Sequence, residues 1–162
     1  MEKKKRAVLF VFRFLAFAAA ISATIVMATS NENAFFYGIE LEASYNNSPA
    51  LTYFVIAYSI VTVYGFLLLF LPPSSKLWQF VVAVDVIATV LVTSSFSAAL
   101  AVAYVGKQGN SSAGWLPICD QVSDFCKQIA GALVAGFAAM IIYTGLLLYS
   151  IHTVLDPLLV FD

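Results

Sequence analysis

Two formal charges stand inside long apolar stretches of the sequence, and they are the residues most able to do chemistry. Arg13 lies in the first stretch and Asp85 in the third. A charge at the centre of a membrane helix costs roughly 2.5–3.5 kcal/mol on insertion scales, so such residues are usually paired or functional. With 1.5 Å of rise per helical residue, Arg13 lies roughly 9 Å and Asp85 roughly 12 Å from the same membrane face. At that offset, an arginine can bind a carboxylate through two parallel hydrogen bonds.

This pair has two interpretations, an ion or proton relay and a buried ion pair that holds helices together. A relay normally needs several ionisable groups in series, and none follows Arg13 or Asp85 along the sequence. The neighbouring positions on each helix face carry small or hydroxyl side chains, which are typical of helix–helix contacts in membranes. These neighbours are Ala16, Ala20, Ala88 and Thr89, together with the larger Val92. The pattern favours the structural ion pair.

The only two cysteines, Cys119 and Cys126, fall in the loop between the third and fourth apolar stretches. If this loop is extracellular, its oxidising surroundings favour a disulfide. On a continuous helix the two Cα atoms would be about 10 Å apart, beyond the roughly 7 Å limit for a bridge, so the segment between them must bend. A metal site is the alternative, but the loop has no histidine and offers only Asp120 and Asp124 as further ligands.

Other chemistry has little support in the sequence. The single histidine, His152, has no nucleophile and carboxylate arranged with it as in a catalytic triad. We find no glycine-rich phosphate loop and no Cys-x-x-Cys motif. The only basic cluster is 3–6, and the net charge is −1, which argues against a nucleic-acid partner. We therefore expect no enzyme, no cofactor and no metal.

The elements that carry these residues are set by composition. Of the 162 residues, 62% are hydrophobic and 10% are charged, whereas soluble domains carry about a quarter charged residues. Each of four apolar stretches is long enough to cross a bilayer, which takes roughly 20 helical residues. The sequence thus predicts an all-α integral membrane four-helix bundle in a single domain, and it shows no heptad repeat. The predicted transmembrane segments are 7–29, 50–71, 77–105 and 129–151.

Loop charges predict the orientation of this bundle. The N-terminus and the turn 72–76 together hold five Lys or Arg residues, whereas the loops 30–49 and 106–128 hold two. The positive-inside rule therefore places both termini in the cytoplasm. The two outer loops contain glycosylation sequons at Asn46 and Asn110. A cleaved signal peptide is the alternative for the N-terminus, but its apolar run is too long and Arg13 interrupts it.

Small residues recur at helical spacing in the third and fourth stretches. They allow close approach of helices, either within one chain or between chains, and the sequence does not divide them between these uses. The positions are Ser95, Ala99, Ala103, Gly131, Ala132, Ala135, Gly136 and Ala139.

Together these motifs resemble the Casparian strip membrane protein (CASP) family of plants, and specifically a CASP-like protein of the first subgroup. The resemblance covers nearly the whole chain, and the family fold is akin to the MARVEL four-helix domain. The residues that carry the resemblance are Arg13, Met27-Ala28-Thr29, Ser48-Pro49-Ala50-Leu51-Thr52-Tyr53-Phe54, Asp85, Ser94-Ser95-Phe96-Ser97-Ala98-Ala99, Tyr104-Val105-Gly106, Trp115, Ile118-Cys119 and Phe125-Cys126.

The resemblance implies a retained first helix and a multi-pass protein of the plasma membrane. It implies a homodimer or higher homo-oligomer, hetero-oligomers with other CASP-like proteins, and stable membrane domains that recruit secreted cell-wall enzymes such as peroxidases. The first outer loop, 31–47, lacks the stretch associated with the true Casparian strip members, which argues against lignin patterning in the endodermis. We expect a scaffold that organises local cell-wall modification; the alternative is a small transporter or channel that uses Arg13 and Asp85.

Overall fold

Four long helices account for most of this computed structural model, which describes residues 2–36, 39–70 and 78–159. All four are long and apolar enough to cross a membrane, with candidate spans at Ala7–Ala28, Pro49–Phe70, Phe80–Gln108 and Ser123–Thr153. The all-α four-helix class predicted from the sequence is confirmed. The helices are α1 (Glu2–Ala28), α2 (Pro49–Phe70), α3 (Trp78–Gln108) and α4 (Ser123–Leu159).

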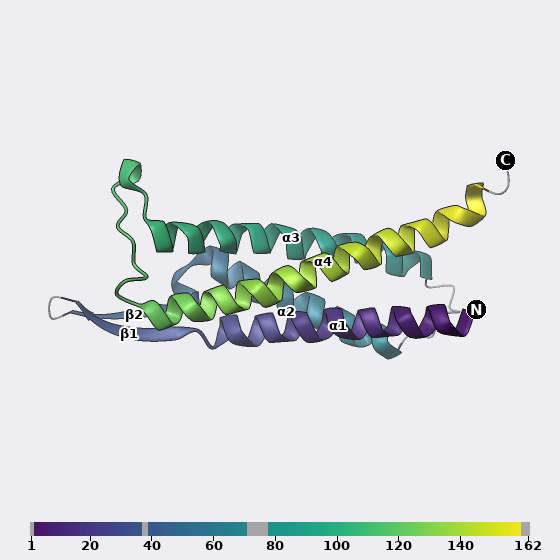
Figure 1. The fold of residues 1–162 in the computed structure, drawn as a ribbon, viewed down its shortest axis with the longest axis horizontal. Helices are drawn as coiled ribbons and strands as arrows, with labels where there is room; N and C mark the ends of the chain where they lie inside the picture. Colours follow the sequence, from purple (N-terminus) through teal and green to yellow (C-terminus); the bar gives the residue numbers. More distant parts are fainter. Residues whose placement is uncertain (1, 37–38, 71–77, 160–162) are drawn as a thin grey trace.

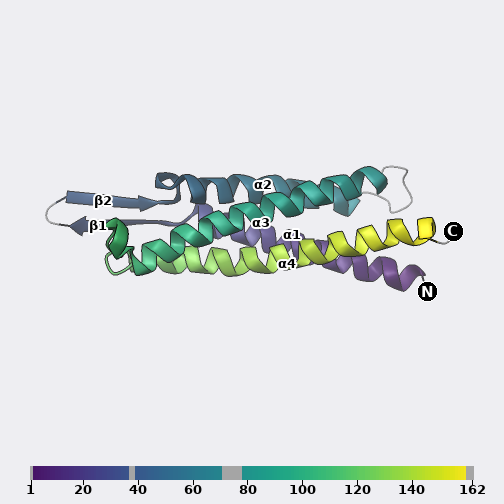
Figure 2. The same cartoon turned by 90° about the horizontal axis from the view of Figure 1, so that it is seen from above.

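The helices form a bundle in which α1 and α3 each pack against both α2 and α4. Consequently α1 and α3 lie on one diagonal of the bundle, and α2 and α4 lie on the other, as Figures 1 and 2 show. The start of α1 and the end of α4 lie at the same end of the molecule. The segments that join α1 to α2 and α3 to α4 lie at the opposite end, which we call the loop end.

The buried positions of each helix are spaced alternately by three and four residues. This spacing is typical of left-handed bundles with coiled-coil-like packing. No heptad repeat is visible in the hydrophobicity of the sequence, so this spacing was not predicted. The buried positions that follow the spacing are Arg13, Ala16, Ala20, Ala23 and Met27 on α1; Leu51, Phe54, Tyr58, Val61 and Gly65 on α2; Val81, Asp85, Ala88, Val92, Ser95 and Ala99 on α3; and Phe125, Ile129, Ala132, Gly136, Ala139, Tyr143, Leu146 and Ser150 on α4.

The first loop contains a β-hairpin, which was not predicted from the sequence. Strand β1 (Asn31–Phe36) pairs antiparallel with β2 (Ile39–Ser44), and Figure 1 shows the hairpin extending away from the helices. The buried Ser30 ends α1 by donating its hydroxyl to the carbonyl of Met27, at 2.7 Å. After a short 3₁₀ turn, α2 begins at Pro49, a residue whose fixed φ and missing N–H suit the first helical position.

The second loop folds back on the end of α3. Helix α3 is followed by Gly109, which has a φ of +69° and so adopts the left-handed conformation that commonly ends helices. A tight turn then closes through two backbone hydrogen bonds between Asn110 and Trp115. Farther along, the amide of Ile118 donates to the carbonyl of Gly106 at 2.9 Å. These bonds give the loop a defined path across the loop end.

We predict that both termini are cytoplasmic, because the basic residues of the sequence cluster at the N-terminus. Epitope tags fused to either terminus should resist protease added to intact cells and become sensitive once the cells are permeabilised. A tag inserted between 111 and 114, at the loop end, serves as the accessible control. Digestion of either terminal tag on intact cells would contradict the four-span orientation.

Candidate functional site

An ion pair lies in the interior of the bundle. The Nη2 atom of Arg13 on α1 lies 3.3 Å from Oδ2 of Asp85 on α3. Both residues are buried, with 8% and 3% of their surfaces exposed. Because α1 and α3 occupy one diagonal of the bundle, this ion pair spans its centre rather than one of its edges.

Side chains from the other two helices complete the surroundings of the carboxylate. On α2, the hydroxyl of Tyr64 donates to Oδ1 of Asp85 at 2.6 Å. On α4, the fully buried Ser150 lies beside the same carboxylate. All four helices therefore meet at Asp85, and a buried carboxylate with two donors has much of its hydrogen-bonding capacity satisfied. We call Arg13, Tyr64, Asp85 and Ser150 the ionic centre.

Arg13 and Asp85 were predicted from the sequence as site residues, whereas Tyr64 and Ser150 were not. A signal for Tyr64 was present, because it stands six residues before the end of α2. That is roughly 9 Å of helix, a depth similar to that of Arg13. The depth comparison used for the two charges could thus have been extended to hydroxyl-bearing residues.

Aromatic side chains bridge the other diagonal of the bundle. The hydroxyl of Tyr58 on α2 donates to the carbonyl of Gly136 on α4 at 2.8 Å, and its ring stacks on Phe54. In the reverse direction, the hydroxyl of Tyr143 on α4 donates to the carbonyl of Val61 on α2 at 3.3 Å. The buried Gly136 lets α4 approach the rings of Phe54 and Tyr58 closely, because a Cβ atom at this position would lie 2.8 Å from the ring of Phe54. Aromatic rings thus fill the centre of the bundle between the ionic centre and the loop end.

A disulfide links Cys119 and Cys126, with their Cα atoms 5.7 Å apart. The backbone bends between them as the spacing requires, since a turn precedes the start of α4 at Ser123. The bridge connects the second loop to the first turn of α4, where Cys126 is the fourth residue. It therefore fixes the loop relative to that helix.

The hairpin is also attached to α4. The Oε2 atom of Glu32 on β1 accepts a hydrogen bond from the backbone amide of Phe125, at 2.8 Å. The first amides of a helix have no partner within the helix, and a carboxylate there is also favoured by the helix dipole. Both outer segments, the hairpin and the disulfide-closed loop, are thus held at the first turns of α4.

We predict that the disulfide forms in the native protein and stabilises the loop end. Closing a loop of this length contributes roughly 2–3 kcal/mol in the chain-entropy description, so Cys126→Ser should make the loop end easier to cleave with protease. A thiol reagent should leave the folded, unreduced protein unmodified. The control is labelling after reduction and denaturation, when both thiols should react. Labelling of two thiols without reduction would contradict the bridge.

The remaining predicted site residues lie on the surface. Both sequon asparagines, Asn46 and Asn110, are exposed, and their glycosylation remains a prediction. Trp115 is 61% exposed in the second loop, and the neighbouring Leu116 is 81% exposed. His152 is exposed near the end of α4. Within 2–36, 39–70 and 78–159, no group of three His, Cys, Asp or Glu residues is placed to hold a metal ion.

These features define an integral membrane four-helix protein with an internal ion pair and two structured segments at one end. A family model described as the Casparian strip membrane protein domain matches residues 2–142. The chain therefore belongs to the Casparian strip membrane protein family, as the motifs of the sequence predicted. No solved structure matches it.

Its relatives carry CASP-like names and come from plants. It is 57% identical over 159 residues to CASP-like protein 1C3 of Populus trichocarpa, covering 98% of this chain and 93% of that protein. It is 60% identical over 149 residues to CASP-like protein 1C1 of Arabidopsis thaliana, covering 92% of this chain and 91% of that protein. It is 55% identical over 143 residues to CASP-like protein 1C2 of Vitis vinifera, covering 88% of this chain and 89% of that protein. The resemblance to the first CASP-like subgroup is thus confirmed.

Proposed function

We propose that this protein is a non-enzymatic plasma-membrane scaffold that assembles into membrane domains and organises local cell-wall modification. The observation that carries the proposal is the position of the ionic centre. Arg13 and Asp85, the two charges inside the apolar stretches, bind each other across the interior of one chain, and Tyr64 binds the same carboxylate. This arrangement uses the charges to join helices, as a structural ion pair does.

The alternative, a small transporter or channel, would use the same two residues to line a path for an ion or solute. Intramembrane carboxylates are functional sites by default, so this alternative has a physical basis. However, the carboxylate is enclosed by contacts from all four helices and is 3% exposed. A transported ion would have to displace Arg13, which costs more than binding at an open carboxylate.

The loop end offers the surface that a scaffold needs for partners. The exposed Trp115 and Leu116 are fixed to the bundle by the disulfide and by the bonds from the loop to α3. Contiguous exposed apolar residues on a fixed loop commonly mark contact sites for other proteins. In the predicted orientation this surface faces the cell wall, where secreted enzymes would be recruited. Other copies of this chain and other CASP-like proteins are the partners we propose within the membrane.

Assembly and transport can be tested on the same preparation. The chain, extracted in native nanodiscs without detergent, should be recovered as a homodimer or a larger assembly by mass photometry. After reconstitution into liposomes, it should leave ion and proton gradients unchanged. If the native chain shows a flux, Asp85→Asn recovered in the folded state serves as the internal comparison, because loss of the flux in the folded variant would identify a transporter. A monomer that carries flux would contradict the scaffold.

A further inference from the structure

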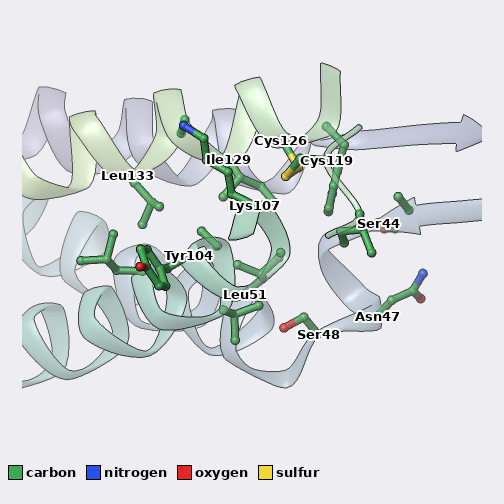
Figure 3. A pocket seen from close by; sticks show the side chains of 18 residues that line it. Ser44, Asn47, Ser48, Leu51, Tyr104, Lys107, Cys119, Cys126, Ile129 and Leu133 are labelled. Atoms are coloured by element: carbon green, nitrogen blue, oxygen red, sulfur yellow. A yellow bond between two sulfur atoms is a disulfide. The ribbon is translucent and has the colours of Figure 1, made fainter. Parts of the chain in front are cut away.

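The loop end contains a pocket that the scaffold proposal does not use. It has a volume of about 410 Å³ and lies between the start of α2, the end of α3 and the start of α4. Figure 3 shows Leu133 and Tyr104 at its deep end, and Ser44 and Asn47 at its outer end. The disulfide between Cys119 and Cys126 forms part of its wall. Its volume falls in the range of pockets that bind small molecules.

The depth of the pocket places it beside a bilayer leaflet. Leu100, on its wall, is eight residues before the end of α3, which is about 12 Å of helix. Leu133 is ten residues past the start of α4, about 15 Å. These side chains therefore lie within the candidate membrane spans, whereas Ser44 and Asn47 precede α2. A ligand that fills the pocket would extend from the membrane interface toward the hydrocarbon region.

The chemistry of the lining changes along the same direction. The deep part is formed by apolar side chains, among them Leu100, Ala103 and Leu133. Most of the polar lining residues belong to the segment before α2 and to the last turn of α3, where Lys107 supplies a positive charge; the exception is Tyr104 at the deep end. An apolar lining, with hydroxyl and amide groups near the mouth and a long lysine side chain that starts one residue before the end of α3, fits a molecule with one hydrocarbon chain to insert and an anionic group to leave at the interface.

From this arrangement we propose that the pocket binds a phospholipid of the leaflet at the loop end, with one acyl chain in the pocket and the phosphate near Lys107. Charge complementarity selects this ligand over a sterol, whose single hydroxyl has no use for a cation. The proposal requires only that the bundle is embedded in a bilayer, and it is independent of scaffold function.

A photoactivatable phosphatidylcholine, with a diazirine on one acyl chain, tests the proposal in liposomes that contain the full chain. After illumination and digestion, the labelled peptides should contain the pocket positions of α3 and α4. Ala130→Trp introduces bulk at an exposed pocket position, and this labelling should be lost. The matched control is Gly131→Trp, at the same depth of α4, where a Cβ atom meets nothing within 4 Å. Its labelling should match that of the native chain.

Two further measurements keep the proposal falsifiable. Ala103→Trp fills the pocket from α3, so loss of labelling in both filling variants, with unchanged thermal unfolding, supports binding in the pocket. Lys107→Gln should weaken retention of the phospholipid about tenfold, as expected when a hydrogen bond to a charged group is lost. Labelling spread over all lipid-facing surfaces, or unchanged in both filling variants, would overturn the proposal. Labelling by a photoactivatable sterol in place of the phospholipid would overturn the assignment of the ligand.

Discussion

Asp85→Asn is expected to lower the free energy of unfolding by about 3–5 kcal/mol, the cost of leaving a buried charge without its partner. The substitution keeps the size of the side chain but removes the charge that faces Arg13 across the bundle. Tyr64 also loses the anionic acceptor that it contacts at 2.6 Å. Arg13→Gln should have an effect of similar size, because it leaves the carboxylate without its counter-charge. Titration with a denaturing detergent in bicelles would measure both changes.

A double-mutant cycle separates direct pairing from independent roles. If Arg13 and Asp85 stabilise the bundle through each other, the double variant Arg13→Gln with Asp85→Asn should cost much less than the sum of the single effects. Exchanging the charges, as Arg13→Asp with Asp85→Arg, should recover part of the folded yield. Tyr53→Phe is the control, because this tyrosine of α2 contacts Ser94 and not the ionic centre. Additivity within about 0.5 kcal/mol would argue against the pair.

Gly136→Leu is expected to destabilise the bundle by about 1–3 kcal/mol or more, the usual cost of overpacking a filled core. A Cβ atom at this position would lie 2.8 Å from Phe54 and 3.0 Å from the hydroxyl of Tyr58. Both rings are fully buried and stack on each other, so they have little room to move. The hydrogen bond from Tyr58 to the carbonyl of Gly136 would be disturbed as well.

The matched control for this substitution is Gly145→Leu on the same helix. Gly145 is exposed and a Cβ atom there meets nothing within 4 Å, so the leucine would project outward from the bundle. It should leave the unfolding midpoint near that of the native chain. Equal effects of the two substitutions, measured by detergent titration and by the mobility of the folded protein on a sizing column, would show that α4 does not pack as described.

The sequence predicted the four-helix class because bilayer thickness and backbone hydrogen bonding leave few ways to place four long apolar stretches. It also predicted which charges would meet. Arg13 and Asp85 stand out among apolar neighbours, and the rise of a helix converts their positions into comparable depths. Length, charge and depth can all be read from the order of residues alone.

The packing pattern inside the bundle could not be read in the same way. In a soluble bundle, buried positions are apolar and outward positions are polar, so a heptad is visible in the hydrophobicity of the sequence. Here the outward positions include large apolar residues such as Ile56 and Val90, whereas buried ones include Ala20 and Ser95. Polarity therefore does not distinguish the two sides of each helix. Small residues were noted on α3 and α4, but their neighbours across the bundle required the structure.

The hairpin was missed although a signal was present. The stretch Ile39-Glu40-Leu41-Glu42-Ala43 alternates apolar and acidic residues, which is typical of a strand with one apolar face. The contact of Glu32 with the start of α4 carries no such signal, because 93 residues separate the partners in the chain. Pairing of this kind depends on how the helices bring the two outer segments together.

Lateral mobility in the plasma membrane tests the scaffold most directly. A fluorescent fusion of the full chain, expressed in plant cells, would be photobleached at the cell surface and compared with an unrelated four-span protein of similar size. We expect the fusion to gather in stable patches and its fluorescence to return far more slowly than that of the comparison protein. A uniform distribution that recovers as fast as the comparison protein would contradict it.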